Sequence, residues 1–161
     1  MQKLFDSWIW FRGKSGEYTV IASELNTSIK RGGYKIPILY MANEDSILVN
    51  RFGMNGLFTK YSDKIENVYN KTNEPLFSTI EMITEDGVKL KIDGRKIIDN
   101  ADIFKRGPLP IHFKWILPIL KFGSKISSID PYYTRFESDL IIETADSTFK
   151  GLGILEIMDL K

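Results

Sequence analysis

Apolar and polar residues alternate with a period of two along most of the chain, and this pattern predicts β-strands. The clearest example is segment 88–93, where valine, leucine and isoleucine occupy every second position. A slip of one residue would bury two lysine ammonium groups, so the register of this strand is well determined. We expect Val88, Leu90 and Ile92 to be buried and Lys89 and Lys91 to be exposed.

Turn-forming residues group the predicted strands into four hairpins. They pair Ser7–Arg12 with Glu17–Leu25, Lys35–Ala42 with Ile47–Phe52, Leu76–Thr84 with Val88–Asp93, and Asp139–Thr144 with Thr148–Met158. Strands of this number, joined by short turns, are typical of a β-sandwich or a β-barrel and not of a parallel α/β sheet. The sequence therefore predicts an all-β, antiparallel fold.

One stretch departs from the two-residue period. Apolar residues recur at helical spacing over residues 113–120, and Gly123 follows as a stop signal, so we expect a short helix near residues 110–122. The polar residues 67–75 predict a loop. Neither a repeat nor a linker divides the sequence, and we expect residues 1–161 to form a single domain.

Composition narrows the class of protein. The net charge is +1 and no basic stripe stands out, which argues against nucleic-acid partners. No stretch approaches the roughly 18 apolar residues of a membrane span. With no cysteine and no signal-peptide pattern, we expect a cytoplasmic protein. His112 is the single histidine, and we expect it to be structural; neither a metal nor a cofactor is predicted.

Several segments near both ends of the chain resemble one known family. They are Ser7-Trp8-Ile9-Trp10-Phe11-Arg12-Gly13, Gly16-Glu17-Tyr18-Thr19-Val20, Tyr34 with Ile36-Pro37-Ile38, Pro131-Tyr132-Tyr133-Thr134-Arg135-Phe136, and Gly151-Leu152-Gly153-Ile154-Leu155-Glu156. They are similar to the second half of the AttH-like and hydroxyneurosporene synthase (carotenoid 1,2-hydratase) family. The resemblance implies an antiparallel lipocalin-like β-barrel, one of two in the full family, and isoprenoid-type or other apolar small molecules as ligands or substrates.

One motif of that family has no counterpart here. Family members carry an Asp-His-Asn-Trp-Gly-type motif shortly before the Trp-x-Trp-x-Arg strand, whereas only Met1 to Asp6 precede that strand in this chain. We therefore expect the second barrel alone, without hydratase turnover. Such a module has two partner options, a second copy of itself or a separate sister barrel.

The most specific candidate site lies on the first predicted strand. On an alternating strand Trp8, Trp10 and Arg12 share one face, and Ile9 and Phe11 share the other. We expect the first face to point into the barrel, with two indoles as walls and Arg12 as an anchor for a ligand carboxylate or phosphate. The alternative is structural, with Arg12 closing the barrel end by stacking on a tryptophan. Both interpretations expect Trp10 to be buried.

Three carboxylates in apolar strands are candidates for chemistry: Glu24, Glu143 and Glu156. An inward carboxyl would be desolvated and suited to donate a proton to an alkene, as a hydratase requires. Glu156 is the weak catalytic candidate because it interrupts an apolar run. The alternatives are that it pairs with Arg12 or Arg135, or that it faces water.

Function is less determined than fold. We expect a lipocalin-like module that binds a small apolar, isoprenoid- or lipid-like ligand, or that packs on a sister barrel. The alternative is a hydratase- or cyclase-type enzyme that uses an inward carboxyl as general acid. The predicted ligand-binding residues are Trp8, Trp10, Arg12, Tyr18, Tyr40, Arg135 and Glu156.

Overall fold

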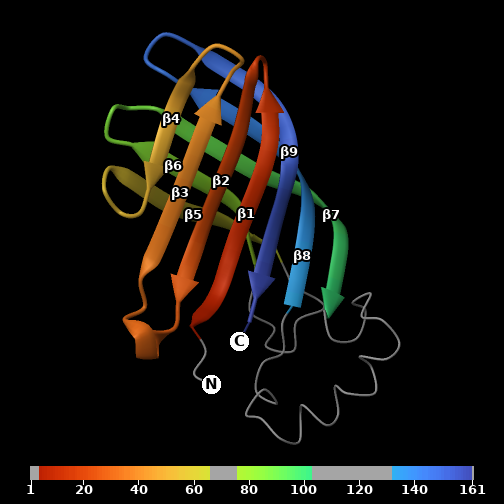
Figure 1. Ribbon diagram of the computed structural model, residues 1–161. Helices are drawn as coiled ribbons and strands as arrows, with labels where there is room; N and C mark the ends of the chain where they lie inside the picture. Colours follow the sequence, from red (N-terminus) through yellow and green to blue (C-terminus); the bar gives the residue numbers. More distant parts are fainter. Residues whose placement is uncertain (1–3, 66–75, 103–131, 161) are drawn as a thin grey trace, which may run out of the picture.

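A computed structural model describes residues 4–65, 76–102 and 132–160. In these segments one nine-stranded antiparallel sheet, with strand order β4-β3-β2-β1-β9-β8-β7-β6-β5, coils into a nearly closed, lipocalin-like barrel (Figure 1). The strands are β1 (Phe5–Ser15), β2 (Tyr18–Thr27), β3 (Lys35–Ala42), β4 (Ile47–Phe52), β5 (Leu57–Ile65), β6 (Leu76–Thr84), β7 (Lys89–Asp102), β8 (Tyr132–Glu143) and β9 (Thr148–Asp159). A short 3₁₀ helix, η1 (Ile29–Arg31), connects β2 to β3.

Side chains close the barrel where the edge strand β5 approaches β3, beside the other edge strand, β4. We call this junction the seam. Tyr61 of β5 hydrogen-bonds to Glu24 of β2 near one end of the seam. Toward the other end, the guanidinium of Arg51 on β4 lies 3.6 Å from the carboxylate of Asp86 in the turn between β6 and β7. The edges of the described sheet are therefore joined by a few contacts and not by a continuous ladder.

The core fills the inside of the barrel. Inward positions alternate along each strand, so that one row runs Phe11, Ala22 and Leu39 across β1, β2 and β3. The largest side chains under 2% exposed are Phe11, Phe136, Leu39, Met41, Ile80, Met82, Leu90, Ile92, Leu140, Ile142, Leu155 and Glu24. Eleven of these twelve are apolar, which makes the carboxylate of Glu24 the exception.

Aromatic rings replace missing side chains where β1 and β9 cross. Gly13 and Gly153 are register partners, and a Cβ at Gly13 would lie 2.6 Å from the ring of Phe11. The ring of Phe136 covers Gly94 in the same way on the opposite wall. A Cβ at Gly13 or Gly153 would overlap the ring of Phe11, whereas a Cβ at Gly94 would make a tight contact with the ring of Phe136.

The four predicted hairpins are confirmed. Val88, Leu90 and Ile92 are buried and both intervening lysines are exposed, as predicted from the period of two. The first strand is longer than predicted, because it continues through Gly13 to Ser15. β5 was not predicted. The predicted helix at 110–122, His112 and the loop at 67–75 lie outside the described residues.

The predicted orientation of the first strand is wrong. Phe11 is fully buried and Ile9 is 8% exposed, whereas Trp10 is 39% exposed and Arg12 faces solvent. Trp8, Trp10 and Arg12 therefore lie on the outer face. They do not line the interior of the barrel, and Arg12 does not close its end. The physical reason is that the even-numbered face also carries Lys14, so turning it inward would bury two cations.

A candidate ligand site inside the barrel

The candidate site is centred on a carboxylate inside the barrel. Glu24 belongs to the inward set of β2, together with Val20 and Ala22, and its side chain is 1% exposed. Its Oε1 accepts a 2.5 Å hydrogen bond from the hydroxyl of Tyr61 across the seam. Its Oε2 is buried and has no hydrogen-bond partner in the part of the chain that the structure describes. A buried acceptor without a donor costs free energy, so this oxygen is suited to receive one.

Tyr61 is held as a neutral donor. Burial raises the pKa of its phenol far above the usual value, and the negative charge of Glu24 and the hydrogen bond to it raise the pKa further. Its ring packs against Phe77, and the ammonium of Lys35 lies 5.2 Å from the ring centroid. Tyr61 therefore donates to Glu24 throughout the physiological pH range.

Further buried polar groups lie on the inner face of the barrel. Register partners place Pro37, Glu24, Ile9, Ile157, Thr134 and Asn100 in one row around the wall, and we call this the polar row. Both amide atoms of Asn100 are buried without a hydrogen-bond partner among the described residues. The Oγ1 of Thr59, on the same face of β5 as Tyr61, is also unpartnered. Unsatisfied groups are thus contributed by β2, β5 and β7.

The polar row marks a boundary inside the barrel. On one side lies the filled core around Phe11 and Phe136. On the other side the next inward positions are Ser7 and Asn26, which hydrogen-bond to each other. This is the end at which both termini lie (Figure 1). A ligand here would contact apolar core on one side and polar groups on the other.

A second polar cluster lies on the outer face of β1, β8 and β9. Glu156 Oε1 is 3.2 Å from the guanidinium of Arg135 and 3.6 Å from that of Arg12. Arg135 Nε also donates to the hydroxyl of Tyr133 at 2.9 Å. Burial raises the pKa of Tyr133, and Glu156 raises it further. Exposed ion pairs of this kind contribute about 0.2–1 kcal/mol, so the cluster is a surface network.

The structure brings together some of the sequence-predicted site residues but not inside the barrel. Arg12, Arg135 and Glu156 meet on the outer face, and this pairing is the alternative that the sequence analysis gave for Glu156. Tyr40 lies on the outer face of β3, opposite Ile21. Tyr18 packs edge-on against Phe149 at the end of the barrel away from Glu24. Glu143 is exposed.

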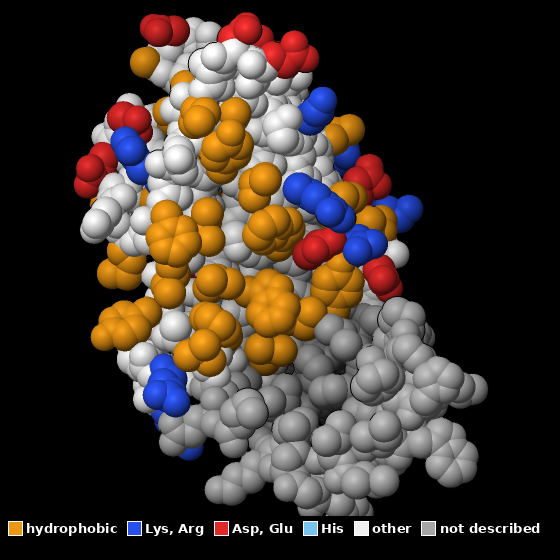
Figure 2. Space-filling model, viewed as in Figure 1, with side chains coloured by type: hydrophobic (Ala, Val, Ile, Leu, Met, Phe, Trp, Pro, Cys, Tyr) orange, Lys and Arg blue, Asp and Glu red, His pale blue; other side chains and the backbone are white. Residues whose placement is uncertain are grey.

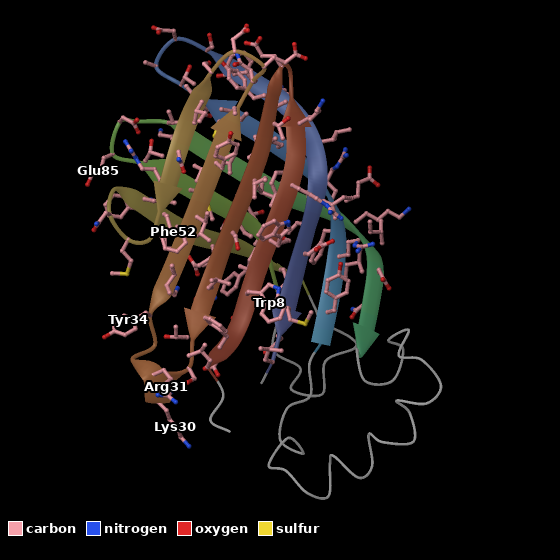
Figure 3. All side chains as sticks on the ribbon, viewed as in Figure 1. Trp8, Lys30, Arg31, Tyr34, Phe52 and Glu85 are labelled. Atoms are coloured by element: carbon pink, nitrogen blue, oxygen red, sulfur yellow. The ribbon has the colours of Figure 1, made fainter. Side chains whose placement is uncertain are left out.

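The outer wall also carries a broad apolar surface, visible in Figure 2 over β1, β2 and β3. Trp10, Ser23, Ile38 and Phe52 form one row of register partners across β1 to β4. We define the outer apolar face by the side chains of Trp8, Trp10, Leu25, Ile36, Ile38, Tyr40 and Phe52. Phe52 is 70% exposed, and Figure 3 shows Trp8 and Phe52 on the same side of the barrel.

No family model matches the sequence, and no curated protein matches it. Similar folds occur among solved structures. CghA with Sch210972 aligns with a TM-score of 0.61 at 11% identity, over 99% of this chain and 42% of that one. Kievitone hydratase from Nectria haematococca aligns with a TM-score of 0.56 at 12% identity, over 96% of this chain and 40% of that one.

The shared feature is the fold. The chain spans about two fifths of the length of each of these proteins, and identities this low extend the likeness to the barrel alone. Within the described segments, no helix is long and apolar enough to cross a membrane.

Sequence reasoning missed Tyr61, Thr59 and Asn100. The first two lie on β5, whose alternation is broken by the polar run 62–64 and by the positive φ of Asp63. Asn100 follows two register shifts in β7, which leave Lys96 and Ile98 exposed and interrupt the alternation between Ile92 and Asn100. Glu24 was a candidate, and its spacing from Val20 and Ala22 was the available signal for an inward carboxyl.

Proposed function

We propose that this lipocalin-like barrel binds a small, mainly apolar molecule at the polar row. The observation that carries the proposal is the unpartnered Oε2 of Glu24 inside an otherwise apolar barrel. The filled core around Phe11 and Phe136 limits the ligand to the end of the barrel that holds Glu24. Sites of this kind combine apolar walls with a few polar groups that fix the orientation of the ligand.

The two structural neighbours support the same class of function. One is a structure of CghA with the small molecule Sch210972, and the other is named a hydratase. We extend to this chain only the general idea of a barrel that receives small organic molecules. The AttH-like and hydroxyneurosporene synthase resemblance belongs to this proposal, with an isoprenoid- or lipid-like ligand as its natural consequence.

The alternative function is a hydratase- or cyclase-type enzyme. In such an enzyme Glu24 is a better candidate for the general acid than Glu143 or Glu156. Glu24 is the inward carboxyl that such a mechanism requires, whereas Glu156 lies on the outside among arginines. A protonated Glu24 would donate its proton to an alkene carbon, water would add to the resulting cation, and the Glu24 carboxylate would take back a proton from the added water. We favour binding because Tyr61 already occupies one oxygen of Glu24 and joins it to the seam.

The test uses the neutral fluorescent probe N-phenyl-1-naphthylamine. We expect the native chain to bind it, and Asn100→Phe, which fills the polar row, to weaken binding about tenfold or more. Trp10→Ser on the outer apolar face serves as the matched control and should leave probe affinity unchanged. Absence of probe binding, or loss in Trp10→Ser alone, would contradict an interior site. Incubation with terpenoid alkenes, followed by mass spectrometry, should show no added water; product that disappears in Glu24→Gln would establish the enzyme instead.

The outer apolar face supports a second part of the proposal, in which the barrel packs on another barrel. We propose a second copy of this chain as the occupant. The matched proteins are more than twice as long as the region they share with this chain, so two copies would reach a comparable total length. Single exposed apolar side chains are normal on a monomer, whereas a contiguous apolar surface marks an interaction site. The outer apolar face, which includes Trp10 and Phe52, is contiguous.

Light scattering after size exclusion measures this association directly. We expect twice the mass of the chain for the native protein and the mass of one chain for Trp10→Lys. Ile98 is 46% exposed on β7, which β9 and β8 separate from β1 in the sheet, and Ile98→Lys is the control that should stay dimeric. A native protein that runs as a monomer at every concentration would refute the second copy.

A further inference from the structure

Glu24 is the acidic group of the polar row. In the described part of the chain, Glu24 forms a hydrogen bond with Tyr61 and no ion pair with any lysine or arginine. Lys35, the cation over the ring of Tyr61, is exposed to solvent. A buried carboxylate is costly unless it is paired with a cation or satisfied by donors. Tyr61 supplies one donor to Oε1, and Oε2 can accept a second.

The surroundings of Glu24 define what the second donor is attached to. Its register partners are Ile9 and Pro37, and Ile157 follows Ile9 in the polar row. These side chains offer no hydrogen bonds. A hydrated inorganic ion would place water against these apolar side chains. An organic molecule with an apolar body would instead cover them and exclude water. The donor therefore belongs to an organic molecule.

The other unpartnered polar groups are neutral and lie on β7 and β5. Asn100 presents one acceptor and two donors, and Thr59 presents a hydroxyl, all unpartnered among the described residues. These neutral groups accept or donate as required, whereas a second negative charge beside Glu24 would be repelled. The polar row thus discriminates by charge at Glu24 and tolerates varied hydrogen bonding elsewhere.

We propose that the ligand of this barrel is an apolar molecule with a cationic, hydrogen-bond-donating head, a protonated amine, that binds Oε2 of Glu24. The proposal rests on the interior site proposed above and assigns its ligand class. A hydroxyl head forms a weaker, uncharged version of the same bond. A carboxylate head is rejected.

Three unbranched eight-carbon molecules that differ in their head group test this order: octylamine, 1-octanol and octanoate. Thermal unfolding of the native chain is measured with each at the same concentration, because a ligand that binds the folded state raises the midpoint. We expect the largest rise with octylamine, a smaller one with 1-octanol and none with octanoate. From the concentration dependence, octylamine should bind about tenfold or more tightly than 1-octanol.

Glu24→Gln keeps the size of the side chain and an acceptor for Tyr61 while it removes the charge. In this variant octylamine should lose its advantage and bind no better than 1-octanol. Glu143→Gln removes an exposed carboxylate and is the matched control, in which the native order should persist.

The outcomes separate this inference from the proposed function. Equal shifts for all three molecules in the native chain would overturn the amine assignment, and this comparison requires no variant to fold. An octylamine advantage that survives Glu24→Gln would also overturn it. If N-phenyl-1-naphthylamine binds in the interior while these results fail, the binding module stands and only its ligand class is wrong.

Discussion

Phe11→Ala is expected to lower the free energy of unfolding by about 3–5 kcal/mol, the range found when a buried aromatic residue is truncated to alanine. Phe11 is fully buried, and its ring lies on Gly13 and Gly153. Glycines have no side chains that could relax into the space left by the ring, so the cavity would persist. Urea unfolding followed by far-ultraviolet circular dichroism measures the change.

Trp10→Ala is the matched control on the neighbouring position. Trp10 has a larger side chain than Phe11 but is 39% exposed on the outer face. We expect a loss of about 1 kcal/mol, typical of positions outside the core. A larger loss for Trp10→Ala than for Phe11→Ala would show that β1 has the opposite face inward.

Gly151→Ala is expected to cost about 3–5 kcal/mol, as much as the loss of a large core side chain. A Cβ at Gly151 would overlap the carbonyl oxygen of Lys14 and lie 2.6 Å from the Cα of Ser15. Both atoms belong to the backbone of β1, so no side-chain rotation relieves the clash. The pair β1–β9 would have to separate locally, and differential scanning calorimetry would record a lower midpoint.

Gly53→Ala separates this clash from the ordinary cost of replacing a glycine. Gly53 has φ 80 with open space around its Cα, so alanine there meets only the left-handed backbone penalty of about 1–2 kcal/mol. Hydrogen exchange should show faster opening of β1 and β9 amides in Gly151→Ala and not in Gly53→Ala. Equal losses of stability in the two variants would contradict the close approach of β1 and β9.

The hairpins could be predicted because short turn signals separate runs of strand-forming residues. For segment 88–93, only one register keeps Lys89 and Lys91 in water. β1 lacks this constraint over its first half, since Trp8 and Trp10 on one face compete with Ile9 and Phe11 on the other. The deciding residues come later in the strand, where Arg12 and Lys14 fall on the tryptophan face.

The interior site could not be assembled from the sequence because it depends on contacts between distant strands. Glu24 and Tyr61 are 37 residues apart, and the hydrogen bond between them exists only when the sheet has coiled. The competing candidate, Glu156, has apolar neighbours on both faces of β9, so its orientation follows from pairing with Arg135. The sequence pattern shows which residues of a strand share a face. Tertiary contacts decide which face, and therefore which carboxylate, points into the barrel.

The seam has a consequence for how this barrel sets its circumference. Between paired strands, backbone hydrogen bonds fix the spacing at about 4.8 Å, and no side chain can change it. Across the seam the described contacts are made by side chains, Glu24 of β2 with Tyr61 of β5 and Arg51 of β4 with Asp86 of the turn between β6 and β7. Substitutions at these few positions would widen or narrow the interior while strand number and register stay constant. Related proteins with the same sheet could thus accommodate ligands of different width through changes at two or three residues.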